Sequence, residues 1–248
     1  MSHPNVEIFN NQADLIKRAS EIFISVTNES VVKNGRFLTA FSGGSTPKAL
    51  FQLLATPAYV SQIDWLHTHV FWGDERLVPP DDPGSNYKLA MDTLLTHVPI
   101  PVENIHRAKG ELDVKTAVSD YVQQLQRLAL PNQTVPQLDL ALMGLGSDGH
   151  TASLFPGPIP AAENTQPVLA VTANYDGRPA QRITLTPLIF NAARHILFLV
   201  TGEKKATALA AVLNRQDSPE KWPAQRIQPQ NGTVTWLVDE DASLRLEN

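Results

Sequence analysis

Hydrophobic positions along the chain follow two spacings, which together predict the order of its helices and strands. Over residues 10–33 apolar side chains recur three and four positions apart, at Leu15, Ile16, Ala19, Ile22, Phe23 and Val26. This spacing predicts an amphipathic helix that ends near Gly35. Comparable patterns predict further helices with bodies at residues 49–54, 87–95, 114–128 and 202–213.

Short, strongly apolar runs predict buried strands between these helices. They occur at residues 36–41, 69–72, 138–143, 168–173, 182–185, 195–200 and 233–238. Strands that alternate with helices are typical of a parallel sheet covered on both faces. We therefore expect an α/β fold with an open, doubly wound, mostly parallel Rossmann-like sheet. The 248 residues suit one domain, 1–248, with loop excursions at 77–86, 156–167 and 215–232.

Composition and charge exclude several classes of function. The net charge of −5 argues against nucleic acid as a partner. No apolar run is long enough for a membrane helix, and the N-terminal residues lack the layout of a signal peptide. Without cysteine the chain has no disulfide, thiolate metal site or cysteine nucleophile. We expect a cytoplasmic enzyme, a monomer or homodimer, with no membrane partner.

Glycines and polar residues gather at four predicted strand ends. These segments are 42–47, 73–76, 144–150 and 201–205. Because ligands of open parallel sheets bind at the carboxyl ends of the strands, we expect the four segments to form one crevice.

The first segment, SGGSTP, suits a phosphate group. Gly43, Gly44, Ser45 and Thr46 offer backbone N–H groups and hydroxyls where a helix begins, with Thr46 as its expected cap and Pro47 as its first residue. Positive charge could come from Lys205, one turn into a later helix, and from Arg182 at the start of a strand. The simpler alternatives are a glycine turn, a solvated lysine and an edge arginine.

The segment 140–155, LALMGLGSDGHTASLF, allows two interpretations. Its glycines match the G-x-G-x-x-G spacing of dinucleotide-binding loops, but that motif requires a long helix, and Pro156 breaks the chain at once. Acid–base chemistry fits better, because Asp148 can orient His150 as a general base. The charged triplet Asp74, Glu75 and Arg76 either lines the same crevice or is a solvated turn.

Taken together, these motifs resemble the 6-phosphogluconolactonase family. SGGSTP, WGDER followed by SNY, GLGSDGHTASLFP and TGEKKA occur in the order of that family and span most of the chain. The resemblance implies hydrolysis of a phosphorylated sugar lactone, 6-phospho-D-glucono-1,5-lactone, without a metal or organic cofactor. It implies that His150 activates water beside Asp148 and that residues 43–46 and Lys205 bind phosphate. It places Asp74 and Arg76 in the pocket, and Arg182 less firmly.

Two other functions remain open within the wider superfamily. Glucosamine-6-phosphate deaminases resemble the chain too, and their proton-abstracting aspartate aligns with Asp74. Those enzymes carry a glutamate before the proline of this loop, where this chain has Phe155. An aromatic ring cannot shuttle protons, which favours the lactonase. A non-catalytic sugar-phosphate sensor usually carries a preceding helix-turn-helix, which the sequence does not indicate, since a strand is expected within its first ten residues.

Overall fold

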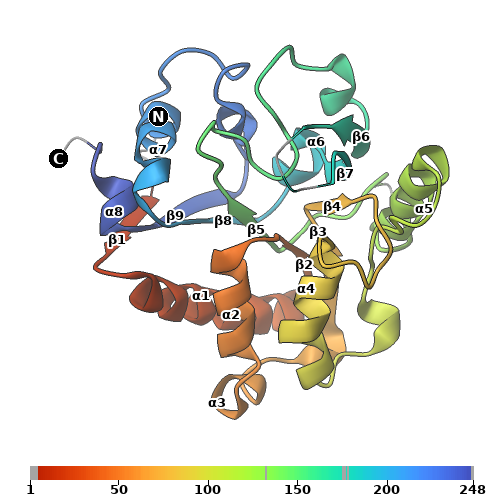
Figure 1. Ribbon diagram of the computed structural model, residues 1–248. Helices are drawn as coiled ribbons and strands as arrows, with labels where there is room; N and C mark the ends of the chain where they lie inside the picture. The colour runs from red at the N-terminus through yellow and green to blue at the C-terminus, as the bar shows by residue number, and fades with distance from the viewer. Residues whose placement is uncertain (1–4, 132, 175–176, 178, 247–248) are drawn as a thin grey trace.

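A parallel sheet of six strands forms the centre of the molecule. The computed structural model describes residues 5–131, 133–174, 177 and 179–246. The strand order is β1-β9-β8-β5-β2-β3, and each neighbouring pair is parallel (Figure 1). The strands are β1 Asn5–Phe9, β2 Phe37–Phe41, β3 Thr68–Trp72, β5 Leu140–Gly144, β8 His195–Val200 and β9 Thr233–Asp239.

Helices cover both faces of this sheet (Figure 1). One hydrophobic cluster joins the sheet to α1 Gln12–Asn34, α2 Ser45–Leu54 and α4 Asn86–Thr93. The second hydrophobic cluster joins the sheet to α5 Val114–Arg127, α6 Pro187–Phe190, α7 Ala206–Leu213 and α8 Glu240–Ser243. A short helix, α3 Pro57–Val60, follows α2. Along β5, Leu140 and Leu142 enter the first cluster, while Ala141 and Met143 enter the second. This two-sided burial confirms the predicted fold class.

A small antiparallel sheet lies beside the central one, and the sequence prediction missed its arrangement. Its order is β4-β7-β6, with β4 Asp74–Arg76, β7 Gln181–Leu185 and β6 Val168–Thr172. Of the two alternatives for residues 74–76, the solvated turn is therefore wrong, because these residues form a strand in which Asp74 and Glu75 are buried. A strand of three charged residues has no apolar alternation to reveal it, and only its pairing with β7 defines it.

The start of α2 also differs from the prediction. The helix begins at Ser45, with Gly44 as the N-cap, so Thr46 is not the cap and Pro47 is not the first residue. The φ of Gly44 is 111°, a value that glycine reaches easily, which lets the helix start two residues earlier than expected. Before α7, residues Glu203–Lys205 form a separate 3₁₀ turn rather than the first turn of the predicted helix.

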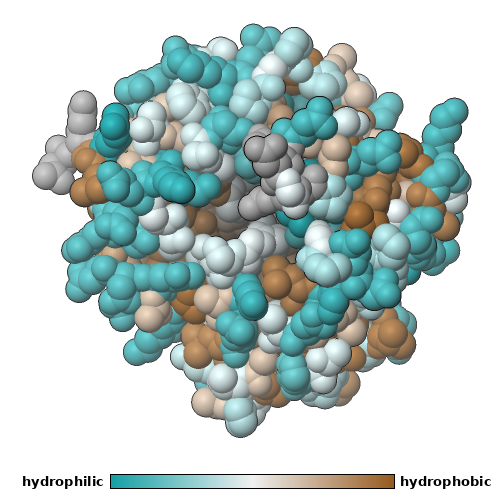
Figure 2. All heavy atoms as spheres, in the orientation of Figure 1, coloured by the Kyte–Doolittle hydropathy of each residue, from teal (hydrophilic) through white to brown (hydrophobic). Residues whose placement is uncertain are grey.

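The surface is largely hydrophilic on the face shown in Figure 2. Among the described residues, none of the helices combines the length and apolar character that crossing a bilayer requires.

Two stacked histidines at the edge of the sheet should make stability depend on pH. His69 Nδ1 and His106 Nε2 are 3.1 Å apart, and the His106 ring stacks on Phe71. Burial, aided by the charges of His69 and Arg127, lowers the pKa of His106 to about 4. In the unfolded chain, histidines titrate near about 6.5. As pH falls, the unfolded chain therefore takes up this proton at a higher pH than the folded chain does.

We expect the stabilising contribution of neutral His106 to be lost as pH falls from about 6.5 to about 4. The free energy of unfolding, measured by urea denaturation at several pH values, should fall more steeply in the wild type than in His106→Asn (H106N). His97, an exposed histidine, provides the control H97N, which should follow the wild type. Equal slopes for the wild type and H106N would contradict this expectation.

Candidate active site

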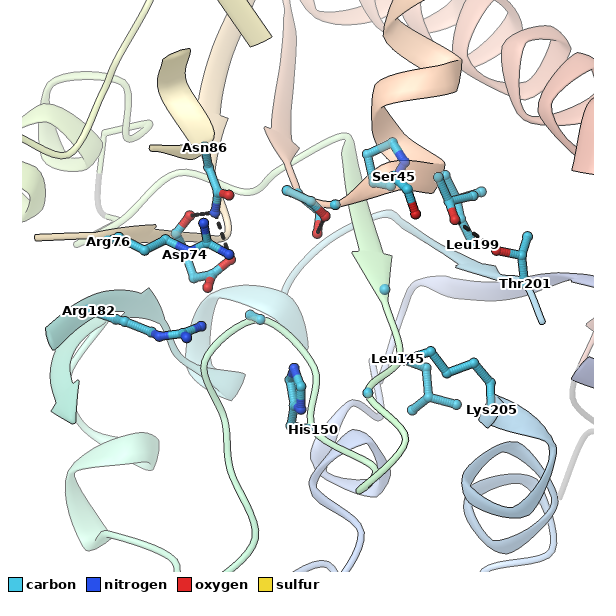
Figure 3. Close-up of a pocket in the computed structure, with 18 residues that line it drawn as sticks. Ser45, Asp74, Arg76, Asn86, Leu145, His150, Arg182, Leu199, Thr201 and Lys205 are labelled. Carbon is cyan, nitrogen blue, oxygen red and sulfur yellow. Dashed lines mark hydrogen bonds between the residues drawn. The ribbon is translucent and has the colours of Figure 1, made fainter. Parts of the chain in front are cut away.

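The four strand-end segments predicted from the sequence meet in one pocket. It has a volume of about 240 Å³ and lies at the carboxyl ends of the central strands (Figure 3). The strand order reverses near this point, because β3 lies on one side of β2 and β5 on the other. Its lining consists of Ser42, Gly43, Gly44, Ser45, Thr46, Pro47, Asp74, Arg76, Asn86, Gly144, Leu145, Gly146, His150, Ala152, Arg182, Leu199, Thr201 and Lys205.

Every predicted site residue except Asp148 lines this pocket, and Asp148 contacts His150 from behind. Sequence reasoning did not single out Asn86, Ala152 or the apolar wall formed by Leu145 and Leu199. Asn86 belonged to a recognised motif, but nothing in its local pattern indicated a role.

His150 and Asp148 form a hydrogen-bonded pair at the pocket wall. Asp148 Oδ1 lies 2.6 Å from His150 Nδ1 and accepts the His150 backbone N–H at 3.2 Å. Because a carboxylate only accepts, this bond places the imidazole proton on Nδ1 and leaves Nε2 as the basic atom. Gly146 makes room for the pair, since a Cβ there would lie 2.1 Å from His150 Nδ1.

Phe155 packs against the other side of the His150 ring. The two ring centroids are 5.1 Å apart, and the guanidinium of Arg182 lies 5.4 Å from the Phe155 ring centroid. The backbone carbonyl of Phe155 accepts a hydrogen bond of 3.1 Å from Arg226. The aromatic ring therefore restrains both a candidate base and a candidate cation.

The N-terminus of α2 opens toward the pocket. No side chain among the described residues caps this helix, so its first N–H groups are available to an anion. The hydroxyl of Thr46 instead lies 2.9 Å from that of Thr201, which joins α2 to the end of β8. At Gly43 a Cβ would lie 1.9 Å from Asn86 Oδ1, so glycine is required for the close approach of α4.

Three cationic side chains line the pocket. Arg76 and Arg182 are directly opposite each other in the antiparallel ladder, and Arg182 is buried. Arg76 donates to the carbonyl of Gly84, while its Nε is buried without a hydrogen-bond partner among the described residues. Lys205 approaches from the turn before α7. Like charges that face each other across a ladder are unfavourable alone, and they suit an anionic ligand.

Asp74 is the acidic member of the same ladder face. Its side chain is buried, with Oδ2 accepting a 2.6 Å hydrogen bond from the Ser153 hydroxyl. Asn86 Nδ2 donates to the Asp74 carbonyl at 2.8 Å and approaches its Oδ1 at 3.4 Å. These hydrogen bonds hold the Asp74 side chain in a fixed orientation.

Glu75 faces away from the pocket and holds the start of α4. Its carboxylate accepts the backbone N–H groups of Arg76, Asn86 and Tyr87, each at 2.7 Å, and the hydroxyl of Ser85 at 3.0 Å. Burial raises the pKa of Glu75, and these hydrogen bonds oppose the increase. Glu75 therefore positions Asn86 rather than contacting a ligand.

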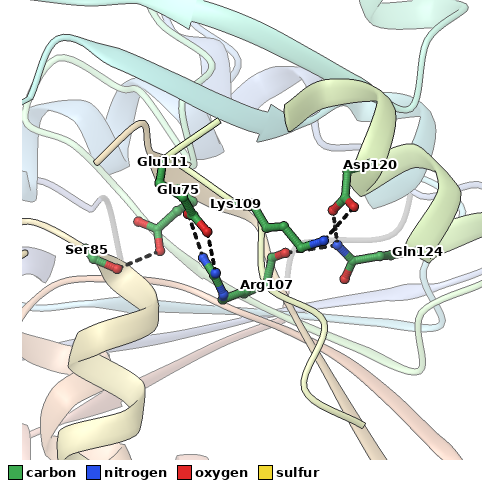
Figure 4. A network of polar contacts seen from close by, with 7 residues as sticks. All are labelled: Glu75, Ser85, Arg107, Lys109, Glu111, Asp120 and Gln124. Atoms are coloured by element: carbon green, nitrogen blue, oxygen red, sulfur yellow. Dashed lines mark hydrogen bonds and ion pairs between the residues drawn. The ribbon is translucent and has the colours of Figure 1, made fainter. Parts of the chain in front are cut away.

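Figure 4 shows Glu75 together with two ion pairs of the segment that leads into α5. Arg107 pairs with Glu111 at 2.5 Å, and Lys109 pairs with Asp120 at 2.7 Å. Gln124 donates to the Arg107 carbonyl at 3.1 Å, which links α5 to the loop before it. Within the described part of the chain, no group of three or more histidine, aspartate or glutamate side chains is placed to hold a metal ion.

The segments that form this pocket lie within a stretch of the chain that matches a known protein family. Residues 10–236 match the model of the family described as glucosamine-6-phosphate isomerases/6-phosphogluconolactonase. The chain belongs to this family. Members of the glucosamine-6-phosphate isomerase/6-phosphogluconolactonase family thus include both kinds of enzyme that the sequence motifs suggested.

Individual family members show how far the likeness extends. A 6-phosphogluconolactonase from a Nostoc species is 41% identical over 245 residues, which cover 97% of this chain and 98% of that protein. The structure of 6-phosphogluconolactonase from Trypanosoma brucei superposes with a TM-score of 0.86 at 26% identity, covering 100% of each chain. A monomeric glucosamine-6-phosphate deaminase, at 21% identity, has a TM-score of 0.83 over 97% of this chain and 99% of that one, which shows a shared fold alone.

Proposed function

We propose that the protein hydrolyses 6-phospho-D-glucono-1,5-lactone to 6-phospho-D-gluconate, a step of the oxidative pentose phosphate pathway. The observation that carries this proposal is the His150–Asp148 pair, which lies in a pocket with an uncapped helix N-terminus and three cations. Relatives of about 40% identity over nearly the whole chain, named 6-phosphogluconolactonase, support it.

The phosphate group of the substrate fits the cationic part of the pocket. The N–H groups at the start of α2 (Gly43, Gly44, Ser45 and Thr46) and the ammonium of Lys205 would bind its oxygens. Arg76 and Arg182 add positive charge from the small sheet. Each charge-assisted hydrogen bond of this kind is worth about 1.5–3 kcal/mol.

Hydrolysis then needs only water and one base. His150 Nε2 removes a proton from water as the water oxygen attacks C1 of the lactone, and Asp148 stabilises the imidazolium that forms. The tetrahedral oxyanion collapses, the bond from C1 to the ring oxygen breaks, and the imidazolium returns the proton to that oxygen. Arg76 and the loop N–H groups are the candidate donors to the oxyanion.

A coupled assay that follows 6-phosphogluconate formation tests the proposal, run beside an assay for glucosamine-6-phosphate deamination. We expect lactone turnover well above the spontaneous rate and no deamination, because Phe155 next to His150 cannot carry a proton. Deamination without lactone hydrolysis would favour the deaminase. A sensor would bind 6-phosphogluconate and turn over neither substrate.

Lys205 provides a test of phosphate binding. The substitution Lys205→Ala (K205A) should raise KM about 10- to 100-fold and change kcat little, because a phosphate contact is made equally before and during the reaction. Its neighbour Lys204 is exposed and does not line the pocket, so K204A is the matched control. A loss confined to kcat would contradict the phosphate-binding role.

We further propose that the enzyme works in the cytoplasm as a monomer or homodimer. Bacterial relatives, such as the 6-phosphogluconolactonase from Haemophilus influenzae, support this proposal. The relatives named chloroplastic are plant proteins. Light scattering on the purified chain tests the oligomeric state, and a larger assembly would overturn it.

A further inference from the structure

Ser153 joins the loop that carries His150 to the small antiparallel sheet. It is buried and lies three residues after His150. Its hydroxyl donates to Asp74 Oδ2 at 2.6 Å, and its backbone N–H donates to the Thr184 hydroxyl at 3.3 Å. Asp74 and Thr184 are opposite each other in the β4–β7 ladder, so one serine contacts both strands at the same point.

The rest of this loop is closed on itself. Gly146 donates its N–H to the His150 carbonyl at 2.7 Å, and the Thr151 hydroxyl donates to the Gly144 carbonyl at 2.8 Å. These bonds fix the shape of the loop after β5. They do not fix where the loop lies relative to the small sheet, which the Ser153 contacts do.

The backbone between His150 and Ser153 is strained. Ala152 has a φ of 48°, in the left-handed region that a non-glycine residue rarely adopts. Such a conformation persists where surrounding contacts over-determine it. The hydrogen bonds of Ser153, which immediately follows, are contacts of this kind.

The position of the small sheet matters because it supplies charge to the pocket. Asp74 and Arg76 are two residues apart in β4 and share a face, and Arg182 is the ladder partner of Arg76. An anchor between Asp74 and the His150 loop therefore sets the separation between the candidate base and two cations (Figure 3).

We propose that Ser153 is a positioning residue for lactone hydrolysis, acting through its hydrogen bond to Asp74. This inference rests on the function proposed above. Ser153 does not line the pocket, so it acts by holding His150 at the attack position relative to Arg76 and Arg182.

The experiment measures kcat, KM and thermal stability of Ser153→Ala (S153A) and Ser153→Cys (S153C) in the coupled lactonase assay. S153C keeps the volume of the side chain and weakens the hydrogen bond, which separates positioning from packing. We expect kcat to fall about 10- to 100-fold in S153A, less in S153C, with KM changed less than about threefold. Ser20, another buried serine, donates to a carbonyl within α1 and provides the control S20A.

A double-mutant cycle tests whether the effect passes through Asp74. In an Asp74→Asn (D74N) background, S153A should lower kcat by less than about twofold, because the charge that receives the hydroxyl is already gone. Independent, multiplicative losses would overturn the inference, as would wild-type kcat in S153A with only a lower Tm. If the wild type did not hydrolyse the lactone, the proposed function itself would be refuted.

Discussion

The substitution His150→Ala (H150A) is expected to lower kcat for the lactone about 10²–10⁴-fold, the usual contribution of a general base. The loss should appear in kcat, with KM little changed, because His150 is proposed to act on water rather than on the phosphate group. The coupled assay measures this after the spontaneous hydrolysis of the lactone has been subtracted. Asp148→Asn should lower kcat less, since it disturbs the Nδ1 bond and leaves Nε2 in place.

The chain contains a matched control for this experiment. His67 Nδ1 lies 2.9 Å from Asp64 Oδ2, a histidine–carboxylate pair that is exposed and lies outside the pocket. H67A should keep the wild-type kcat. If H150A retained near-full activity, His150 would not be the base and the proposed mechanism would fail.

The substitution Glu163→Gln (E163Q) is expected to cost about 3–5 kcal/mol of unfolding free energy. Glu163 Oε1 and Arg226 Nη1 are 2.9 Å apart, and each side chain is only 5% exposed. Burial raises the pKa of Glu163 and lowers that of Arg226, while the attraction between them opposes both shifts. Removing the carboxylate leaves a buried guanidinium without its counter-charge.

Calorimetry and urea denaturation measure this loss, which corresponds to a decrease in Tm of about 6–20 °C for a domain of this size. The partly exposed pair Arg18–Glu7 is the control, and R18A should cost no more than about 1 kcal/mol. Replacing both buried partners with apolar residues (E163L with R226M) should recover part of the stability, because no unpaired charge remains. A cost below 1 kcal/mol for E163Q would contradict the expectation.

The sequence predicted the central sheet well, because its strands are short apolar runs whose two faces are both buried. The β5 strand illustrates this, as alternate residues enter different clusters. It could not predict β4, because the strand character of Asp74, Glu75 and Arg76 comes from pairing with a segment about one hundred positions away. Thr46 was misassigned as a cap for a related reason, since its hydroxyl contacts Thr201 instead.

The candidate site was predictable to the extent that chemistry gathers at strand ends. His150, Lys205 and the glycines that precede α2 were found in this way, and they line one pocket. Asn86 and Ser153 were missed because their partners, Asp74 in both cases, are distant in sequence. Neither residue has a local pattern that distinguishes it from an ordinary polar residue at a helix start or in a loop.

The opposed arginines of the small sheet have a thermodynamic consequence. Arg76 and Arg182 occupy the same ladder position on neighbouring strands, so folding brings two positive charges together. An anion that binds between them relieves this repulsion. Because it binds only the folded chain, it stabilises that chain against unfolding. Ligand affinity and resistance to heat are then linked quantities, and phosphorylated compounds that fit the pocket should raise Tm in proportion to the logarithm of their concentration above Kd.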